Sequence, residues 1–261
     1  MWKYAGLVDI GASEDHNDDR AVIGTKLLSK GVISGTLETP YISVAVCDGV
    51  GGRLSGDRAA EISCEVFARK TYHEGKQMDD VIEAIESANE KVYLTKVKEH
   101  TPNALFTTIA GIYADDEHLF VCNVGDSRVY RLRYQYLMRL SKDHSLVQEM
   151  LDSGEITPEE AFHHERKNVI TNCLGLDGKV NPRVVDFSDD MQERDLFMIC
   201  SDGISDALKE EQIRDILVAY RNSENLNECC LKLKESAMEY GSKDNISVIL
   251  IRKDVTATNG E

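Results

Sequence analysis

Hydrophobic residues along the chain follow two kinds of pattern, one typical of strands and one typical of helices. Short apolar runs rich in β-branched and aromatic residues, bounded by polar or glycine-containing segments, are typical of strands. Strands are expected on this basis at residues 41–47, 107–113, 119–124, 129–132, 196–200 and 246–251. The segment ADDEH at residues 114–118 is short enough for a hairpin, which predicts antiparallel pairing of the strands on either side.

A helical period covers other parts of the chain. Helices are expected at residues 56–70, 78–98, 145–152, 210–220 and 226–240, and Gly154 and Gly241 follow two of them as C-terminal caps. The stretch Thr157-Pro158-Glu159-Glu160 supplies an N-cap, a first-turn proline and two acids, so it predicts a further helix. The fold class is therefore α+β with antiparallel strands.

The organisation of the chain is expected to be simple. No internal repeat, low-complexity block or proline-rich linker divides it, so a single domain is predicted for residues 1–254, with 255–261 as a frayed tail. The long polar segment 141–174 interrupts the strands and is treated as an insertion. Insertions of this length are often functional.

Composition narrows the possible partners. The 261 residues are 42% hydrophobic, and 46 acidic against 30 basic residues give a formal charge of -16. This charge opposes binding to nucleic acid and to anionic membrane surfaces. The N-terminus has no signal-peptide pattern, and no window has the length and apolarity of a membrane span, so the expected location is cytoplasmic. The seven scattered cysteines suggest neither disulfides nor a zinc site, and a monomer is the default expectation.

Aspartates recur beside the apolar runs. Asp48 ends the run before VGG, Asp126 and Asp202 follow two further runs, Asp244 precedes the last one, and DHNDDR at 15–20 adds adjacent acids. One such aspartate is an ordinary turn or cap residue. Several converging carboxylates cannot all stay ionised without a compensating cation. Oxygen ligands without cysteine or paired histidine favour Mg²⁺ or Mn²⁺ over Zn²⁺.

These segments together resemble a known family. The ordered motifs are NDD (17–19), CDGVGG (47–52), TT (107–108), GDSR (125–128), SDGISD (201–206) and KDNISV (243–248). They resemble the bacterial metal-dependent PP2C-type (PPM) protein serine/threonine phosphatases, and the resemblance extends over about residues 9–252. It implies a four-layer αββα sandwich, in which two antiparallel sheets pack face to face between outer helices.

The resemblance also implies a metal centre with two Mn²⁺ or Mg²⁺ ions. Asp48 would bridge the ions, the Gly49 carbonyl would be a further ligand, and Asp202 and Asp244 would complete one coordination shell. These three aspartates would act in catalysis through the metals and an activated water, which attacks phosphoserine or phosphothreonine without a protein nucleophile. Phosphorylated proteins are the implied substrates, and a serine/threonine kinase is the implied opposing enzyme.

Other residues receive supporting roles from the same resemblance. Asp18 would lie near the second ion, and Asp19 and Asn245 would support the ligands without contacting a metal. Asp126 matches the carboxylate of a third, weaker metal site in bacterial relatives.

Three positions depart from the family pattern. Glu14 stands where the family usually has an arginine that grips the substrate phosphate, so Arg20 and Arg53 are the candidate phosphate-binding residues. Phe106 replaces the usual glycine before the threonine pair, and Arg53 stands where histidine is common.

These departures keep two alternatives open. The first is a pseudophosphatase that serves as a binding module, and the second is a hydrolase for a specialised phosphoprotein or small phosphoesters. The insertion 141–174, termed the flap after the corresponding segment of the family, is expected to set substrate choice. Four histidines are expected to be surface or hydrogen-bonded loop residues rather than ligands: His16, His144, His163 and His164.

Overall fold

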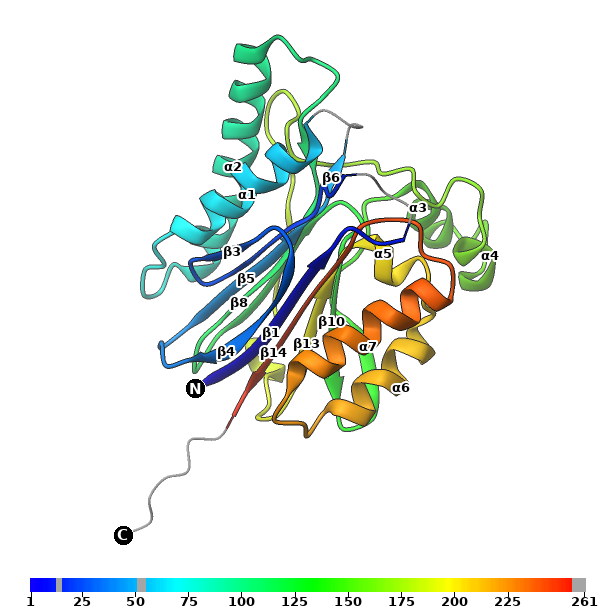
Figure 1. Ribbon diagram of the computed structural model, residues 1–261. Helices are drawn as coiled ribbons and strands as arrows, with labels where there is room; N and C mark the ends of the chain where they lie inside the picture. The colour runs from blue at the N-terminus through cyan, green and yellow to red at the C-terminus, as the bar shows by residue number, and fades with distance from the viewer. Residues whose placement is uncertain (13–15, 51–54, 255–261) are drawn as a thin grey trace.

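Two six-stranded antiparallel sheets form the centre of the molecule (Figure 1). A computed structural model describes residues 1–12, 16–50 and 55–254. In order across the first sheet lie β11 (Tyr136–Arg139), β10 (Arg128–Arg133), β13 (Leu196–Cys200), β14 (Ile246–Lys253), β1 (Trp2–Asp9) and β4 (Gly31–Leu37). In order across the second lie β12 (Arg183–Asp186), β9 (Leu119–Val124), β8 (Ile109–Ala114), β5 (Ile42–Cys47), β2 (Arg20–Ile23) and β3 (Lys26–Leu28). A short third sheet pairs β6 (Gly49–Val50) with β7 (Phe106–Thr107).

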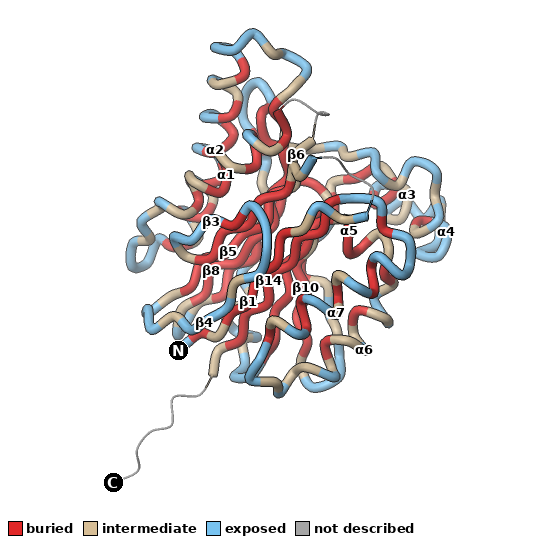
Figure 2. Tube along the Cα trace, in the orientation of Figure 1, coloured by how far each residue is buried: buried red, intermediate tan, exposed pale blue. Residues whose placement is uncertain are grey.

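Helices cover both outer faces of the sheet pair (Figures 1 and 2). They are α1 (Gly56–Arg69), α2 (Gln77–Glu99), α3 (Leu146–Asp152), α4 (Pro158–Phe162), α5 (Asp202–Ser205), α6 (Glu210–Tyr220) and α7 (Leu226–Glu239), with a 3₁₀ turn at Ser188–Asp190. One buried cluster joins the inner faces of the two sheets, and it includes Tyr4 and Ile251 from the first sheet and Val44 and Ile112 from the second. A second cluster packs α6 and α7 on the first sheet, and a third packs α1 and α2 on the second. This arrangement confirms the predicted αββα sandwich.

The helices expected from the sequence agree with the observed ones to within one residue at each end. Thr157 and Glu160 form a capping box at the start of α4. Gly154 and Gly241 have φ of 74° and 91° directly after the ends of α3 and α7, as expected of terminating glycines. The 114–118 connection joins the antiparallel pair β8 and β9, so the predicted hairpin is confirmed.

Seven strands were not expected from the sequence: β1, β2, β3, β4, β6, β11 and β12. The apolar pattern of β1 is broken by Gly6, where an added Cβ would lie 2.9 Å from Ile23 Cδ1 of the opposite sheet. The small residue therefore permits close sheet packing while it weakens the local strand signal. β4 lies at a sheet edge and is largely exposed, so it lacks the apolar run that marks a buried strand.

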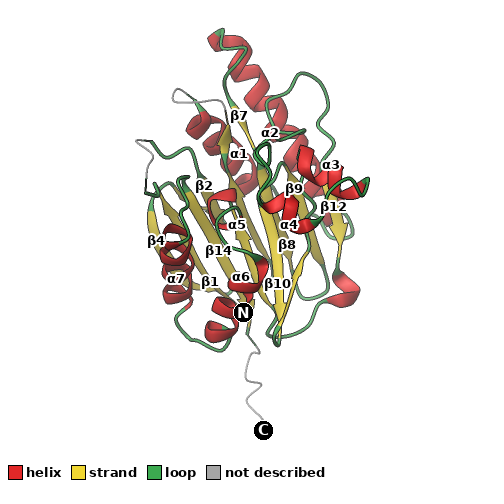
Figure 3. Ribbon diagram, turned by 90° about the vertical axis from the view of Figure 1, so that its right-hand side faces the viewer, coloured by secondary structure: helices red, strands yellow, loops and turns green. Residues whose placement is uncertain are grey.

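The flap follows β11 and contains α3 and α4, which lie together beside α5 (Figure 3). It returns at Leu174, which is bridged to Thr107 of β7. The predicted tail at 255–261 lies outside the described residues. Within the described ranges, no helix has the length and apolarity needed to span a membrane.

Candidate metal centre and active site

Asp48 follows the last residue of β5, and the threonine pair fixes its backbone. The carbonyl of Asp48 accepts hydrogen bonds from Thr108 N and Thr107 Oγ1, both at 2.8 Å. Its own N–H donates to Thr108 Oγ1 at 3.1 Å. Thr108 in turn shares a 2.8 Å hydrogen bond with Ser127, which follows Asp126. These contacts leave the Asp48 carboxylate as the part of the residue available to a ligand.

Gly49 and Gly56 approach each other closely next to Asp18. A Cβ added at Gly56 would lie 2.8 Å from the Gly49 carbonyl oxygen and 2.9 Å from Asp18 Cγ. A Cβ at Gly49 would lie 2.2 Å from the Gly56 carbonyl carbon. Glycine is therefore required at both positions, and the Gly49 carbonyl and the Asp18 carboxylate, two of the predicted ligands, both lie against Gly56.

The supporting residues connect the two sheets. Asp19 is buried and accepts a 2.7 Å hydrogen bond from Ser201 Oγ, one residue before Asp202. Asn245, next to Asp244, accepts a 2.8 Å hydrogen bond from the Asp18 N–H and donates to the carbonyls of Ile10 and His16. Both side chains therefore hold the loop that carries Asp18, which fits the predicted supporting role.

The carboxylates influence one another strongly. Burial raises the pKa of Asp48 well above its ordinary value, and Asp202, Asp19, Asp126 and Asp244 raise it further. Burial likewise raises the pKa of Asp202, to which Asp126 and Asp244 add. The Asp202 Oδ1 atom is buried and has no hydrogen-bond partner among the described residues. An all-oxygen group of this kind, with an unpartnered buried oxygen, fits a hard divalent cation.

Asp126 lies at the edge of this group. Burial raises its pKa to about 7, and the nearby charges of Asp143 and Asp206 contribute to the shift. Asp206 was not assigned from the sequence, although it stands four residues after Asp202 in SDGISD, and one helical turn brings such residues together. Its carboxylate pairs at 2.9 Å with Lys167 of the flap.

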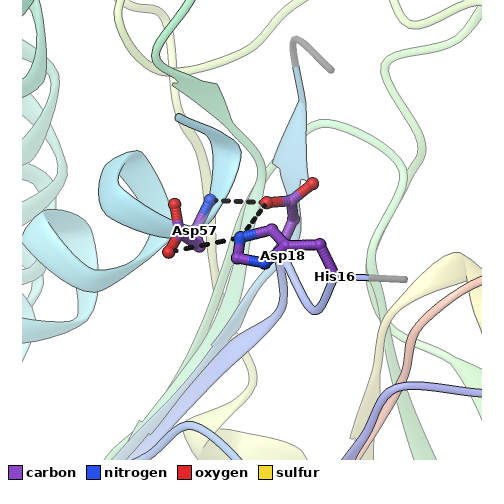
Figure 4. Close-up of side chains that lie close together, drawn as sticks. All are labelled: His16, Asp18 and Asp57. Atoms are coloured by element: carbon purple, nitrogen blue, oxygen red, sulfur yellow. Dashed lines mark hydrogen bonds and ion pairs between the residues drawn. The ribbon is translucent and has the colours of Figure 1, made fainter. Parts of the chain in front are cut away.

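A second group contains side chains from the loop before β2 and from the start of α1 (Figure 4). His16, Asp18 and Asp57 bring three potential ligand atoms within 4.8 Å of one another, the one such cluster found in the described part of the chain. The carboxylates of the predicted set Asp48, Asp202 and Asp244 are not gathered this closely. Neither His16 nor Asp57 was assigned as a ligand from the sequence.

Of the two candidate phosphate-binding residues, the structure describes Arg20 alone. The Arg20 guanidinium is largely buried, where it donates 2.8 Å hydrogen bonds to the carbonyls of Asn17 and Asp19 and a 3.2 Å contact to Asp57. These contacts hold the loop, and phosphate binding by Arg20 stays a prediction. Glu14 and Arg53 lie outside the described residues.

A cavity of about 500 Å³ lies between the flap and the α5–α6 region. Asp126 and Asp206 line it beside the carboxylate group, and Leu151, Phe162 and Leu208 supply apolar wall. The cavity thus provides a recess next to the candidate centre.

Comparison with known proteins identifies the family. The sequence matches the protein phosphatase 2C family over residues 31–235. The serine/threonine phosphatase stp of Listeria monocytogenes is 33% identical over 256 residues, which cover 95% of this chain and 94% of that protein. The chain therefore belongs to the protein phosphatase 2C family, and the prediction of a phosphoprotein phosphatase is confirmed.

Solved structures agree with this conclusion. The serine/threonine phosphatase Stp1 of Staphylococcus aureus superimposes with a TM-score of 0.84 at 25% identity, covering 98% of this chain and 96% of that one. The catalytic domain of the phosphatase PstP, solved with two manganese ions, gives a TM-score of 0.78 at 25% identity, covering 98% of this chain and all of that one. Use of divalent metal ions is a property of the family.

Proposed function

We propose that this protein is a metal-dependent serine/threonine phosphatase that hydrolyses phosphoserine and phosphothreonine in proteins. The main support for this proposal is the group of carboxylates around Asp48, whose pKa values are raised by burial and by mutual repulsion. Burying such a group of ionised carboxylates costs free energy unless a cation compensates their charge. Binding of divalent metal ions, which the family uses, would supply that compensation.

We further propose the ligand set. Asp48 and the Gly49 carbonyl would hold a two-ion centre of Mn²⁺ or Mg²⁺, Asp202 and Asp244 would complete the shell of one ion, and Asp18 would lie near the other. Asp126 would serve a third, weaker site. When bound, such ions lower the pKa of coordinated water and polarise phosphate oxygens.

The residues of the chain would mainly position and shield this centre. Thr107 and Thr108 fix the Asp48 backbone, and Asp19 and Asn245 hold the adjoining loop. Burial raises the pKa of thiols such as Cys47 and Cys200 above the ordinary value of a cysteine. Because the thiolate is the nucleophile, a catalytic cysteine is disfavoured. The cavity between the flap and the α5–α6 region would receive the part of the phosphoprotein next to the phosphorylated residue.

The remaining proposals concern context. Phosphorylated proteins would be the substrates of a single domain at residues 1–254 that acts as a monomer in the cytoplasm and opposes a serine/threonine kinase. The intact set of carboxylates argues against the pseudophosphatase alternative, which Glu14 and Phe106 motivated. Kinetics with phosphopeptides and with nucleotides would separate the proposed activity from hydrolysis of small phosphoesters.

The first test is hydrolysis of p-nitrophenyl phosphate and a phosphothreonine peptide by metal-stripped protein, with and without Mn²⁺. We expect activity only with the metal, and a loss of at least about 100-fold in Asp48→Ala, because a ligand of the centre is removed. The exposed Glu86→Gln on α2 is the control and should keep full activity. If the wild type is inert with every divalent metal while Glu14→Arg is active, the pseudophosphatase alternative would replace the proposal.

A further inference from the structure

His16, Asp18 and Asp57 form a compact group of potential ligand atoms (Figure 4). His16 Nε2 lies 3.4 Å from Asp18 Oδ1 and 3.4 Å from Asp57 Oδ2. Metal–ligand bonds of about 2.0–2.2 Å place neighbouring ligands about 3–3.5 Å apart around one ion. His16 Nε2 therefore lies at this spacing from each carboxylate, and all three potential ligand atoms lie within 4.8 Å of one another.

The two carboxylates of this group are held in place before any ion binds. Asp18 Oδ1 accepts a 2.9 Å hydrogen bond from the Asp57 N–H in the first turn of α1. Asn245, which directly precedes β14, accepts a hydrogen bond from the Asp18 N–H and so fixes the Asp18 backbone. The His16 side chain is about half exposed, and its Nε2 atom faces both carboxylates, so its ring can adjust to a ligand with little repacking.

Charge and space in the group suit a cation. Arg20 contacts Asp57 Oδ2 at 3.2 Å, so one guanidinium faces two carboxylates and the local charge stays negative. Arg20 is anchored through its other terminal nitrogen to two carbonyls, which keeps it at the edge of the group. The Gly49 carbonyl lies against Gly56 together with Asp18, which adds an oxygen donor on the same side.

We propose that His16, Asp18 and Asp57 bind one divalent transition-metal ion, with the imidazole nitrogen of His16 as a direct ligand. This inference rests on the proposed function, in which Asp18 lies near the second ion, and it adds a nitrogen ligand to a set in which every ligand is an oxygen. Imidazole suits transition metals such as Zn²⁺ and Fe²⁺, whereas Mg²⁺ keeps oxygen ligands, so a histidine ligand would favour a transition-metal ion over Mg²⁺ at this position.

The test uses Mn²⁺ alone as the probe, with tag-free protein in buffer without imidazole. Mn²⁺ is titrated to saturation, and pulsed electron paramagnetic resonance measures ¹⁴N coupling to the bound ion. We expect ¹⁴N modulation in the wild type and its loss in His16→Gln. Calorimetry should show one Mn²⁺ site weakened about 10-fold or more in this variant, with a smaller change for Mg²⁺.

His163→Gln is the matched control, because His163 is also an exposed histidine beside a carboxylate, Glu159, at 3.2 Å. It should keep the ¹⁴N modulation. The proposal is overturned if the wild type shows no ¹⁴N coupling at any Mn²⁺ ratio, or if the coupling persists in His16→Gln. Phosphatase activity measured on the same samples reports on the proposed function separately, since the ¹⁴N signal does not depend on turnover.

Discussion

At the scale of single residues, His144 connects the flap to the turn that carries Asp126. His144 Nδ1 accepts a 3.2 Å hydrogen bond from the Gly125 N–H, and the His144 N–H donates back to the Gly125 carbonyl at 2.8 Å. Burial lowers the pKa of His144, so the neutral ring that can accept this hydrogen bond is favoured. The side chain was expected to be a hydrogen-bonded loop residue, and its partner is the residue before a candidate metal ligand.

We expect the stability supplied by His144 to fall at acid pH. Its pKa in the folded protein is lower than in the unfolded chain, so the contribution is present above about pH 6.5 and is lost as the pH falls through the folded value. His144→Ala should lower the free energy of unfolding by about 1 kcal/mol at pH 8, the worth of one hydrogen bond, and by less at pH 5. Thermal unfolding of both proteins across this pH range measures the difference.

His163→Gln, at the exposed residue directly after α4, serves as the control for that experiment and should show no comparable pH trend. His144→Asn offers an oxygen acceptor and should recover part of the loss at pH 8. A constant gap between wild type and His144→Ala at every pH would contradict the assignment of Nδ1 as an acceptor.

The same scale shows what sequence could and could not predict about the site. Asp48 and Asp202 could be assigned because each follows an apolar strand within a recognisable motif. His16 and Asp57 could not, because they are 41 positions apart and meet only when α1 packs beside the loop before β2. A local sequence pattern cannot predict a contact between residues so far apart in the chain.

At the scale of elements, buried strands and helices were predictable, whereas exposed or irregular strands were not. β5, β9 and β13 are fully buried and read as continuous apolar runs. β11 has the pattern YLMR and lies at a sheet edge, where pairing with β10 and not its own hydrophobicity makes it a strand. Its existence depends on tertiary contacts that no local window contains.

The flap gives the prediction that belongs to this scale. Phe162 of α4 lines the cavity beside Asp126, and Lys167 and Lys209 lie with their ammonium groups 5.6 Å from its ring centre. We expect Phe162→Ala to raise KM for a phosphoprotein about 10-fold, a loss of about 1.4 kcal/mol in binding. Hydrolysis of p-nitrophenyl phosphate, which is too small to need the cavity wall, should change less than about twofold.

Val169→Ala, at an exposed flap position outside the cavity, is the control and should leave both substrates unaffected. Steady-state kinetics on the two substrates decide the matter. Equal losses on phosphoprotein and on p-nitrophenyl phosphate would mean that the flap supports the catalytic centre instead of substrate choice.

At the scale of the whole molecule, the fold gathers acidic residues from several segments while the chain as a whole carries a formal charge of -16. Asp126 and Asp202 come from or adjoin the strands β10 and β13 of the first sheet, and Asp48 follows β5 of the second. Packing of the two sheets therefore forces these carboxylates together. The hydrophobic core stabilises an arrangement that would repel itself in the absence of cations.

Without metal, the protein should become less stable as the pH rises. The pKa values of Asp19 and Asp126 are about 7 in the folded protein against about 4 unfolded, so their favourable contribution is complete below pH 4 and is lost as the pH rises through 7. Added Mn²⁺ should offset this loss, and its effect on Tm should grow from pH 5 to pH 8. Thermal unfolding in chelator and in Mn²⁺ measures both trends.

Asp48→Asn separates this electrostatic effect from general metal binding. Removing one charge from the group should raise the Tm of the metal-free protein at pH 8 by several degrees, since 1 kcal/mol corresponds to about 2–4 °C for a domain of this size. The same variant should lose most of the stabilisation by Mn²⁺, because the carboxylate that repels its neighbours is also the proposed ligand. Glu86→Gln removes an equal charge from an exposed helix and should do neither. A lower Tm for metal-free Asp48→Asn at pH 8 would show that Asp48 stabilises the fold through its own contacts, against the view that it is kept for a cation.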